Sequence, residues 1–177
     1  MTALIDTIEH GAITELRLAR PPVNALDPEL CRALAGAVPA AAAAGAQGIV
    51  LSGGDKAFSA GLDVPHLLSL RTRDELGAAW SGFLDAARAL AASKVPVAAA
   101  ITGHSPAGGC VLALCCDYRV MAEGPFRIGL NETQVGLVAP EGIQHLMRRV
   151  VGVHRAERLL VGGELVESAR AFGIGLV

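Results

Sequence analysis

Aromatic side chains are scarce in this sequence, and positive charge is not concentrated anywhere along it. The 177 residues include four Phe, one Trp and one Tyr, and the formal net charge is −2. Proteins that bind nucleic acid present a basic stripe, or aromatic rings on which bases stack. We therefore expect no nucleic-acid partner.

Long hydrophobic runs are also missing, although 52% of the residues are hydrophobic. No window approaches ~18 apolar residues without an interrupting glycine, proline or charge, so a membrane-spanning helix is not expected. Asp6 and Glu9 lie where a secretory signal needs a basic region followed by an apolar one. These features predict a cytoplasmic protein without a membrane partner.

Motifs for metal and nucleotide binding are absent as well. The cysteines Cys31, Cys110, Cys115 and Cys116 form no C-x-x-C pair, and three of them lie in one apolar run. This pattern is typical of reduced core residues rather than of zinc ligands or disulfides, so we predict no metal site. The sequence contains neither G-x-x-x-x-G-K-[ST] nor a complete G-x-G-x-x-G, which argues against a nucleotide loop.

What is present is an alternation of short strands and helices without a linker, which predicts a single α/β domain over residues 1–177. Ile13–Leu18 alternates apolar and polar residues after a glycine, as expected for the second arm of a hairpin. Asp27 followed by Pro28 is typical of a helix start. Further strands are expected at 48–51, from 95 and at 117–122, and helices from 28 to about 45 and at 74–92, 144–150 and 155–161.

The chain is organised around the stretch Val95–Asp117. An apolar run stops at Gly103, a loop of small residues follows, and an apolar helix-like run begins at Gly109. This pattern predicts a buried strand, a tight turn and a helix start, whose free N–H groups favour negative charge. Ser105 in the turn is placed like the nucleophile of a serine hydrolase, and Asp117 and His145 follow it in the order of such a triad. Pro106 argues against that function, because the residue after such a serine must donate an N–H that proline lacks.

Several motifs in the sequence resemble one known family. They are Phe58–Val64 (FSAGLDV), Ile101–Cys110 (ITGHSPAGGC), Cys116–Arg119 (CDYR) and Ile128–Pro140 (IGLNETQVGLVAP). Together they resemble the crotonase, or enoyl-CoA hydratase/isomerase, superfamily, and the last is similar to its Δ3,Δ2-enoyl-CoA isomerases of the mitochondrial type. The resemblance implies a crotonase (ClpP-like) fold, which is a spiral of ββα units with short strands in a twisted core.

In this family the thioester carbonyl of an acyl-CoA lies between two backbone N–H groups, which the resemblance places on Leu62 and Gly108. Such donors stabilise an enolate oxygen, and small neighbours let the acyl group approach the backbone. Coenzyme A is part of the substrate, so no separate cofactor is implied. Asp63 is expected to cap its loop rather than to act as a base. The residues expected to bind substrate are Ala60, Gly61, Leu62, Asp63, Val64, Gly108 and Asn131.

Hydratases of this family use two glutamates, whose positions correspond by resemblance to Val111 and Glu132. Adding water calls for an acid and a base, whereas moving a double bond needs one group that takes a proton and returns it to another carbon. Glu132 as the catalytic base therefore favours an isomerase, and the resemblance implies one of fatty-acid β-oxidation. A hydratase, another enzyme of the family and a non-catalytic acyl-CoA binder are the alternatives.

Other residues have two interpretations each. His104 either contacts substrate or points away from it, and Lys56 is either a partner of a CoA phosphate or an ordinary surface lysine. The apolar stripe of Trp80, Phe83 and Leu84 fits core packing better than the lining of an acyl tunnel.

Members of the family are usually longer than this chain. They continue beyond the position of Gly175–Val177 into helices that help to cover the site and take part in trimer contacts. The resemblance therefore implies that the C-terminal helical part is missing here. It also implies a homo-oligomer, either a trimer or a dimer of trimers.

Overall fold

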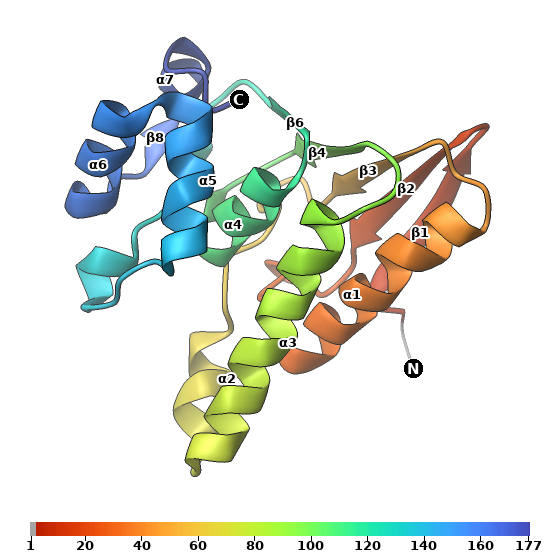
Figure 1. Cartoon of the computed structure of the whole chain (residues 1–177), viewed down its shortest axis with the longest axis horizontal. Helices are drawn as coiled ribbons and strands as arrows, with labels where there is room; N and C mark the ends of the chain where they lie inside the picture. Colours follow the sequence, from red (N-terminus) through yellow and green to blue (C-terminus); the bar gives the residue numbers. More distant parts are fainter. Residues whose placement is uncertain (1–2) are drawn as a thin grey trace.

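A five-stranded sheet is the largest layer of the computed structural model, which describes residues 3–177 (Figure 1). Its strand order is β1-β2-β3-β4-β6. The antiparallel hairpin of β1 and β2 is confirmed, and the other neighbours pair in parallel, which requires crossover connections between them. The strands are β1 (Ile5–His10), β2 (Ile13–Leu18), β3 (Gly48–Ser52), β4 (Val97–Ile101) and β6 (Tyr118–Met121).

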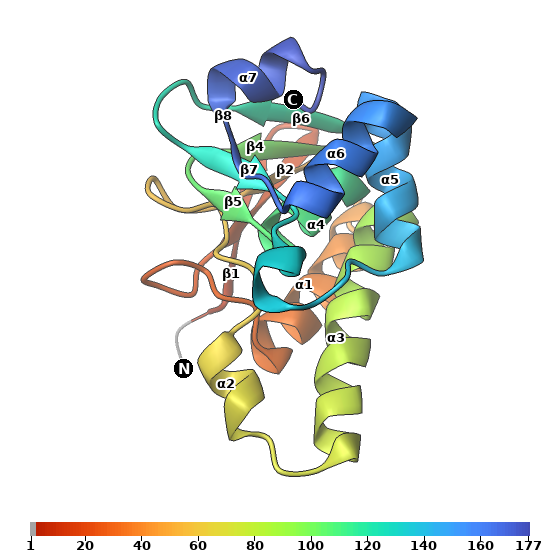
Figure 2. The ribbon, with the colours of Figure 1, turned by 90° about the vertical axis from the view of Figure 1, so that its left-hand side faces the viewer.

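Two long helices, α1 (Pro28–Ala43) and α3 (Arg73–Ala91), pack side by side beneath this sheet (Figures 1 and 2). The predicted start of α1 is confirmed, since the Asp27 side chain accepts a hydrogen bond from the Leu30 N–H at 2.8 Å. Helix α1 runs on through Pro39. A capping box at the first turn of α3 satisfies its free N–H groups in the same way.

Helix α4 (Gly108–Cys115) is the buried centre of the molecule, and all of its residues are shielded from solvent. It contacts both α3 and the later helix α5 (Glu141–Val151). A helix surrounded by protein needs apolar residues on every side, and the uninterrupted sequence of this segment supplies them. All four cysteines are free and buried, as predicted, and burial raises the pKa of Cys31 to about 12.

A second sheet links the glycine turn to the segment that contains Glu132. Its order is β5-β7-β8, with Ser105 of β5 opposite Ile128 of β7. The sequence does not predict this sheet, because strands of two or three residues are too short to show alternation. The strands are β5 (Ser105–Pro106), β7 (Arg127–Gly129) and β8 (Val166–Glu167).

The remaining helices surround the second sheet, except for α2, which projects from the body beside α3 (Figure 2). The sequence predicts α5 and α6 with later starts, and it predicts neither α2 nor α7, whose six residues are too few to show helical periodicity. None of the helices within residues 3–177 combines the length and the hydropathy needed to cross a membrane. The helices whose bounds have not yet been given are α2 (Val64–Ser69), the 3-10 helix η1 (Glu132–Val135), α6 (Val153–Gly162) and α7 (Ser168–Gly173).

The first turn of α4 tolerates no side chain at Gly109. A Cβ there would lie 2.4 Å from the carbonyl oxygen of Ser59, which belongs to the neighbouring loop. We expect Gly109→Ala to lower the free energy of unfolding by about 3 kcal/mol, because backbone must move to accommodate the methyl group. Gly36→Ala in α1 is the matched control, since its Cβ would meet nothing within 4 Å.

Urea denaturation of both variants measures this difference. The control is expected to gain about 0.5–1 kcal/mol, because alanine is the better helix former. Equal stability of the two variants would contradict the close packing of the two loops.

Candidate active site

Two loops, one at each side of the site, are joined through their backbones. The N–H of Phe58 donates to the carbonyl of His104 at 2.9 Å, and the N–H of His104 donates to the carbonyl of Lys56 at 3.0 Å. A Cβ on Gly103 would lie 2.3 Å from the backbone of Lys56, so the approach requires glycine. These contacts bring the FSAGLDV and SPAGG motifs together.

The two predicted backbone donors, Leu62 and Gly108, lie next to each other. A Cβ on Gly108 would be 3.2 Å from the Leu62 nitrogen, and a Cβ on Gly61 would be 3.0 Å from the Gly108 nitrogen. Within residues 3–177, neither of the two N–H groups donates a hydrogen bond to another protein atom. Two free, adjacent donors of this kind are suited to hydrogen-bond to an oxyanion.

The backbone at Ala107 orients the Gly108 donor. Ala107 has φ 46° and ψ −117°, a left-handed region that costs a residue with a side chain about 1–3 kcal/mol. Two hydrogen bonds hold it there: its N–H donates to Gly129 at 2.8 Å, and its carbonyl accepts from Val111 at 3.0 Å. The strain lies directly before the first N–H of α4, where negative charge is favoured.

A cavity of about 270 Å³ opens in front of these donors. Its lining includes Leu62 and Gly108, together with Glu132 in η1 and Val111 in α4. Most of the remaining wall is apolar and comes from α2, α3 and the segment between η1 and α5. Such a cavity suits an acyl group with a single polar centre.

Glu132 is the carboxylate that this cavity contains. Its side chain is half-buried, and burial raises the pKa of that carboxyl above the ordinary range. In the described part of the chain, its Oε2 atom and the Oδ1 atom of Asn131 have no hydrogen-bond partner. A partly buried carboxylate with a raised pKa and one oxygen without a partner is suited to exchange a proton with a ligand. Val111, which the family resemblance places at the other glutamate position of the hydratases, is 2% exposed and apolar.

The predicted substrate-binding residues separate into two groups. Ala60, Leu62, Val64, Gly108 and Asn131 line the cavity, whereas Gly61 and Asp63 lie outside its lining.

Asp63 instead caps α2, where its side chain accepts a hydrogen bond from the His66 N–H at 3.0 Å. It also pairs with Arg20 at 2.7 Å, and these contacts lower the pKa of its carboxyl. Arg20 pairs at 2.9 Å with Asp27 as well, so it joins the start of α1 to the start of α2. The capping role expected for Asp63 is confirmed.

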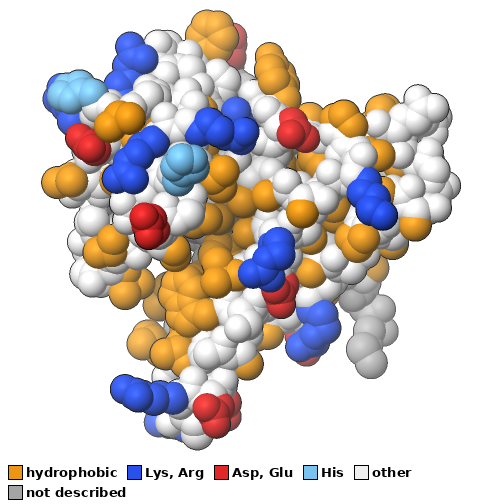
Figure 3. Space-filling model, viewed as in Figure 1, with side chains coloured by type: hydrophobic (Ala, Val, Ile, Leu, Met, Phe, Trp, Pro, Cys, Tyr) orange, Lys and Arg blue, Asp and Glu red, His pale blue; other side chains and the backbone are white. Residues whose placement is uncertain are grey.

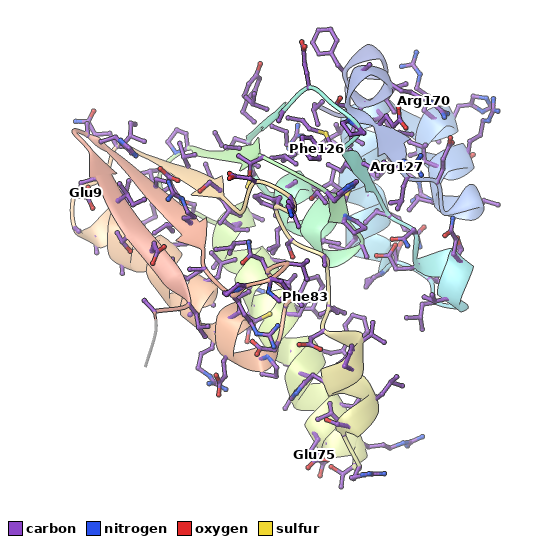
Figure 4. All side chains as sticks on the ribbon, turned by 180° about the vertical axis from the view of Figure 1, so that it is seen from behind. Glu9, Glu75, Phe83, Phe126, Arg127 and Arg170 are labelled. Atoms are coloured by element: carbon purple, nitrogen blue, oxygen red, sulfur yellow. The ribbon has the colours of Figure 1, made fainter. Side chains whose placement is uncertain are left out.

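The aromatic stripe of α3 packs in the core and lines the cavity at once. Trp80 and Phe83 contribute to the wall, with ring centroids 6.2 Å apart, and Phe83 is also a buried core residue (Figure 4). Leu84 packs against the core only. The sequence does not identify Leu67 as a wall residue, because its helix, α2, shows no recognisable periodicity.

Neither His104 nor Lys56 lines the cavity. The Nδ1 atom of His104 accepts a hydrogen bond from the Arg127 N–H at 3.1 Å, and its ring contacts Phe126 edge to face at 5.6 Å (Figure 4). Lys56 is exposed.

A serine triad does not form. Ser105 is fully buried, and in the described residues its Oγ has no partner. The Asp117 side chain accepts a hydrogen bond from the Val97 N–H at 2.9 Å instead. Within residues 3–177 there is also no cluster of three or more His, Cys, Asp or Glu side chains that could hold a metal ion.

The chain is similar to known proteins over nearly its whole length. The family model for enoyl-CoA hydratase/isomerase matches residues 8–177. Mitochondrial enoyl-CoA delta isomerase 1 of Mus musculus is 36% identical over 177 residues, which cover 98% of this chain and 61% of the mouse protein. Crotonyl-CoA hydratase of Syntrophomonas wolfei is 34% identical over 131 residues, which cover 73% of this chain and 49% of that protein. The crystal structure of human mitochondrial delta3-delta2-enoyl-CoA isomerase superposes with a TM-score of 0.94 at 32% identity, covering 98% of this chain and 69% of the human one.

The fold is therefore the crotonase fold, as the motifs predict. The chain belongs to the enoyl-CoA hydratase/isomerase family. It spans 61% of the length of the mouse relative and 58% of that of the human one. Isomerases and hydratases both occur among its relatives, so family membership by itself does not distinguish the two reactions.

Proposed function

We propose that this protein is a Δ3,Δ2-enoyl-CoA isomerase, which moves the double bond of an acyl-CoA from C3 to C2. The observation that carries the proposal is one cavity that is mostly apolar and contains a single carboxylate, with one buried oxygen that has no hydrogen-bond partner among the described residues, together with two free N–H donors. Glu132 is the base, and the N–H groups of Leu62 and Gly108 hold the thioester oxygen.

The reaction needs no group beyond these. Glu132 removes a proton from C2, and the electron pair left behind moves into the thioester carbonyl. The resulting dienolate oxygen accepts hydrogen bonds from Leu62 and Gly108, which stabilise its negative charge. The protonated Glu132 then returns the proton to C4, and the double bond forms between C2 and C3. No atom is gained or lost, so coenzyme A is needed only as part of the substrate.

The raised pKa of Glu132 suits this exchange. A base that gives its proton back to carbon works best when its pKa lies closer to the operating pH than that of an ordinary glutamate. The apolar wall supplies the shift, because burial disfavours the charged form.

Hydration of a 2-enoyl-CoA is the second candidate, because hydratases occur among the relatives. It calls for a second group that acts on water. Val111 of α4, which lines the same cavity as Glu132, offers only a hydrocarbon side chain at the position that the family resemblance gives to the second carboxylate. The isomerase is therefore favoured.

Incubation with 3-enoyl-CoA tests the proposal. We expect its conversion to 2-enoyl-CoA, detected by chromatography as a product of unchanged mass with the absorbance of a conjugated thioester. Incubation with 2-enoyl-CoA is expected to leave its mass unchanged. Formation of 3-hydroxyacyl-CoA, heavier by one water, would favour a hydratase. Acyl-CoA binding with neither product would indicate a non-catalytic binder.

A further inference from the structure

A groove lined by arginines runs between α6 and α7, and the proposed isomerase does not use it. Its volume is about 370 Å³. Figure 3 shows basic side chains gathered over this end of the molecule, and Figure 4 places Arg170 there, far from Phe83 of the acyl cavity. None of its lining residues is shared with that cavity. The residues that define this arginine groove are His154, Arg155, Arg158, Leu159, Glu164, Arg170 and Ile174.

The arginine groove is positive in a chain that is negative overall. Three arginines against one glutamate leave two positive charges in its lining, whereas the whole chain has a net charge of −2. Arg170 is paired with Glu164 through two guanidinium nitrogens. In the described residues, Arg155 and Arg158 pair with no carboxylate.

The positive charges of the arginine groove lie where they destabilise helix α6. His154 and Arg155 stand in the first turn of α6, where the positive end of the helix dipole disfavours cations. That turn contains no acidic residue, and Gly152 before it offers no capping side chain. The first turn of α3, by contrast, contains Asp74 and Glu75. Residues that destabilise the helix to which they belong are typical of binding sites.

We propose that the arginine groove binds the phosphate group of a soluble molecule. A guanidinium presents its N–H groups in a planar fork that matches two phosphate oxygens, and it stays charged at every physiological pH. Arg155 and Arg158 supply two such forks from one helix face, and Arg170 stands across from them on α7. Leu159, which is 6% exposed, forms an apolar floor that keeps water from one side of the anion. This binding is independent of the proposed isomerase activity.

Isothermal titration with pyrophosphate tests the proposal on the unmodified protein. We expect saturable binding at physiological ionic strength, and binding about tenfold weaker in Arg158→Gln, because one charge-assisted contact is lost. Arg155→Gln is expected to behave in the same way and guards against a folding defect in the first variant. Arg32→Gln on the exposed face of α1 is the matched control, since it makes the same change of charge elsewhere.

Four outcomes would overturn the assignment. They are the absence of saturable pyrophosphate binding, an equal loss of affinity in Arg32→Gln, binding of citrate as tight as that of pyrophosphate, and binding to phosphatidylserine vesicles without binding to pyrophosphate. The second would reveal general charge attraction, the third a carboxylate site, and the fourth a lipid surface. Unchanged isomerase activity in Arg158→Gln is expected throughout, which separates this test from that of the acyl cavity.

Discussion

Replacing Glu132 with Gln is expected to lower the turnover of 3-enoyl-CoA by about 10²–10⁴-fold, the usual contribution of a general base. The amide keeps the shape and burial of the side chain but cannot accept the C2 proton. Acyl-CoA binding is expected to persist, because the apolar wall and the donors at Leu62 and Gly108 are untouched. Steady-state kinetics and a separate titration with a saturated acyl-CoA measure the two effects.

Glu141→Gln is the matched control for this variant. Glu141 is an exposed carboxylate at the start of α5, and it does not line the acyl cavity. We expect it to leave turnover unchanged. Full activity in Glu132→Gln would overturn the assignment of the base, and a loss of binding equal to the loss of turnover would show that Glu132 acts in binding instead.

The stability of Glu132→Gln relative to the wild type is expected to depend on pH. Burial raises the pKa of Glu132 in the folded state, so the folded protein holds this proton more tightly than the unfolded chain does. Stability therefore falls as pH rises from the unfolded pKa through the folded one, and above that window the wild type bears the cost of a buried charge. We expect Glu132→Gln to be the more stable protein at neutral pH, with the difference vanishing in acid.

Turnover also depends on the ionisation of Glu132, but turnover is expected to rise with pH where stability falls. The base must be ionised, so activity is expected to fall as pH drops through the raised pKa, at a higher pH than for an ordinary glutamate. Urea denaturation and kinetics over one pH series measure both trends. A stability difference that does not grow with pH would contradict the burial of a charged Glu132.

Gly108→Ala is expected to have the second large effect, a loss of about 10²–10³-fold in kcat/KM. Deleting a backbone donor takes a proline, which also fixes φ, whereas alanine fills the space before the donors and keeps the N–H. The new Cβ would lie 3.2 Å from both the Leu62 nitrogen and the Gly61 Cα, in the gap between the two donors. The thioester oxygen then has no room to accept both hydrogen bonds.

Stability is the control measurement for Gly108→Ala. Its shortest contact, 3.1 Å to Leu26 Cδ1, is with the end of a side chain that can shift, so we expect a smaller loss than in Gly109→Ala. Gly36→Ala again serves as the matched variant without an effect on kinetics. Wild-type kcat/KM in a folded Gly108→Ala protein would contradict the oxyanion site.

Local signals in the sequence predict much of the fold. The alternation in Ile13–Leu18 marks a strand with one buried face, and Asp27-Pro28 marks a helix start because both residues suit free N–H groups. The unbroken apolar run after Gly109 indicates a helix buried on all sides. Each signal lies within a few residues, so no distant contact is needed to interpret it.

Short helices and strands cannot be predicted from such local signals. Helix α2 has no buried residue, and strands β5 and β8 contain two residues each. Their stability comes from partners that are distant in the chain, such as the pairing of Ser105 with Ile128. Helix α2 is such an element and contributes Leu67 to the apolar wall, which is why the sequence misses this residue.

The sequence by itself determined the chemical inventory of this protein: small residues in two loops, Glu132 in the motif after the second loop, and Val111 where the family resemblance places another glutamate. Only the tertiary structure decided how these parts meet. The Leu62 and Gly108 donors become neighbours because two loops, 46 positions apart at these residues, share backbone hydrogen bonds and leave no room for side chains. The raised pKa of Glu132 likewise arises from walls contributed by distant helices, since desolvation depends on what packs around a group and not on its sequence neighbours.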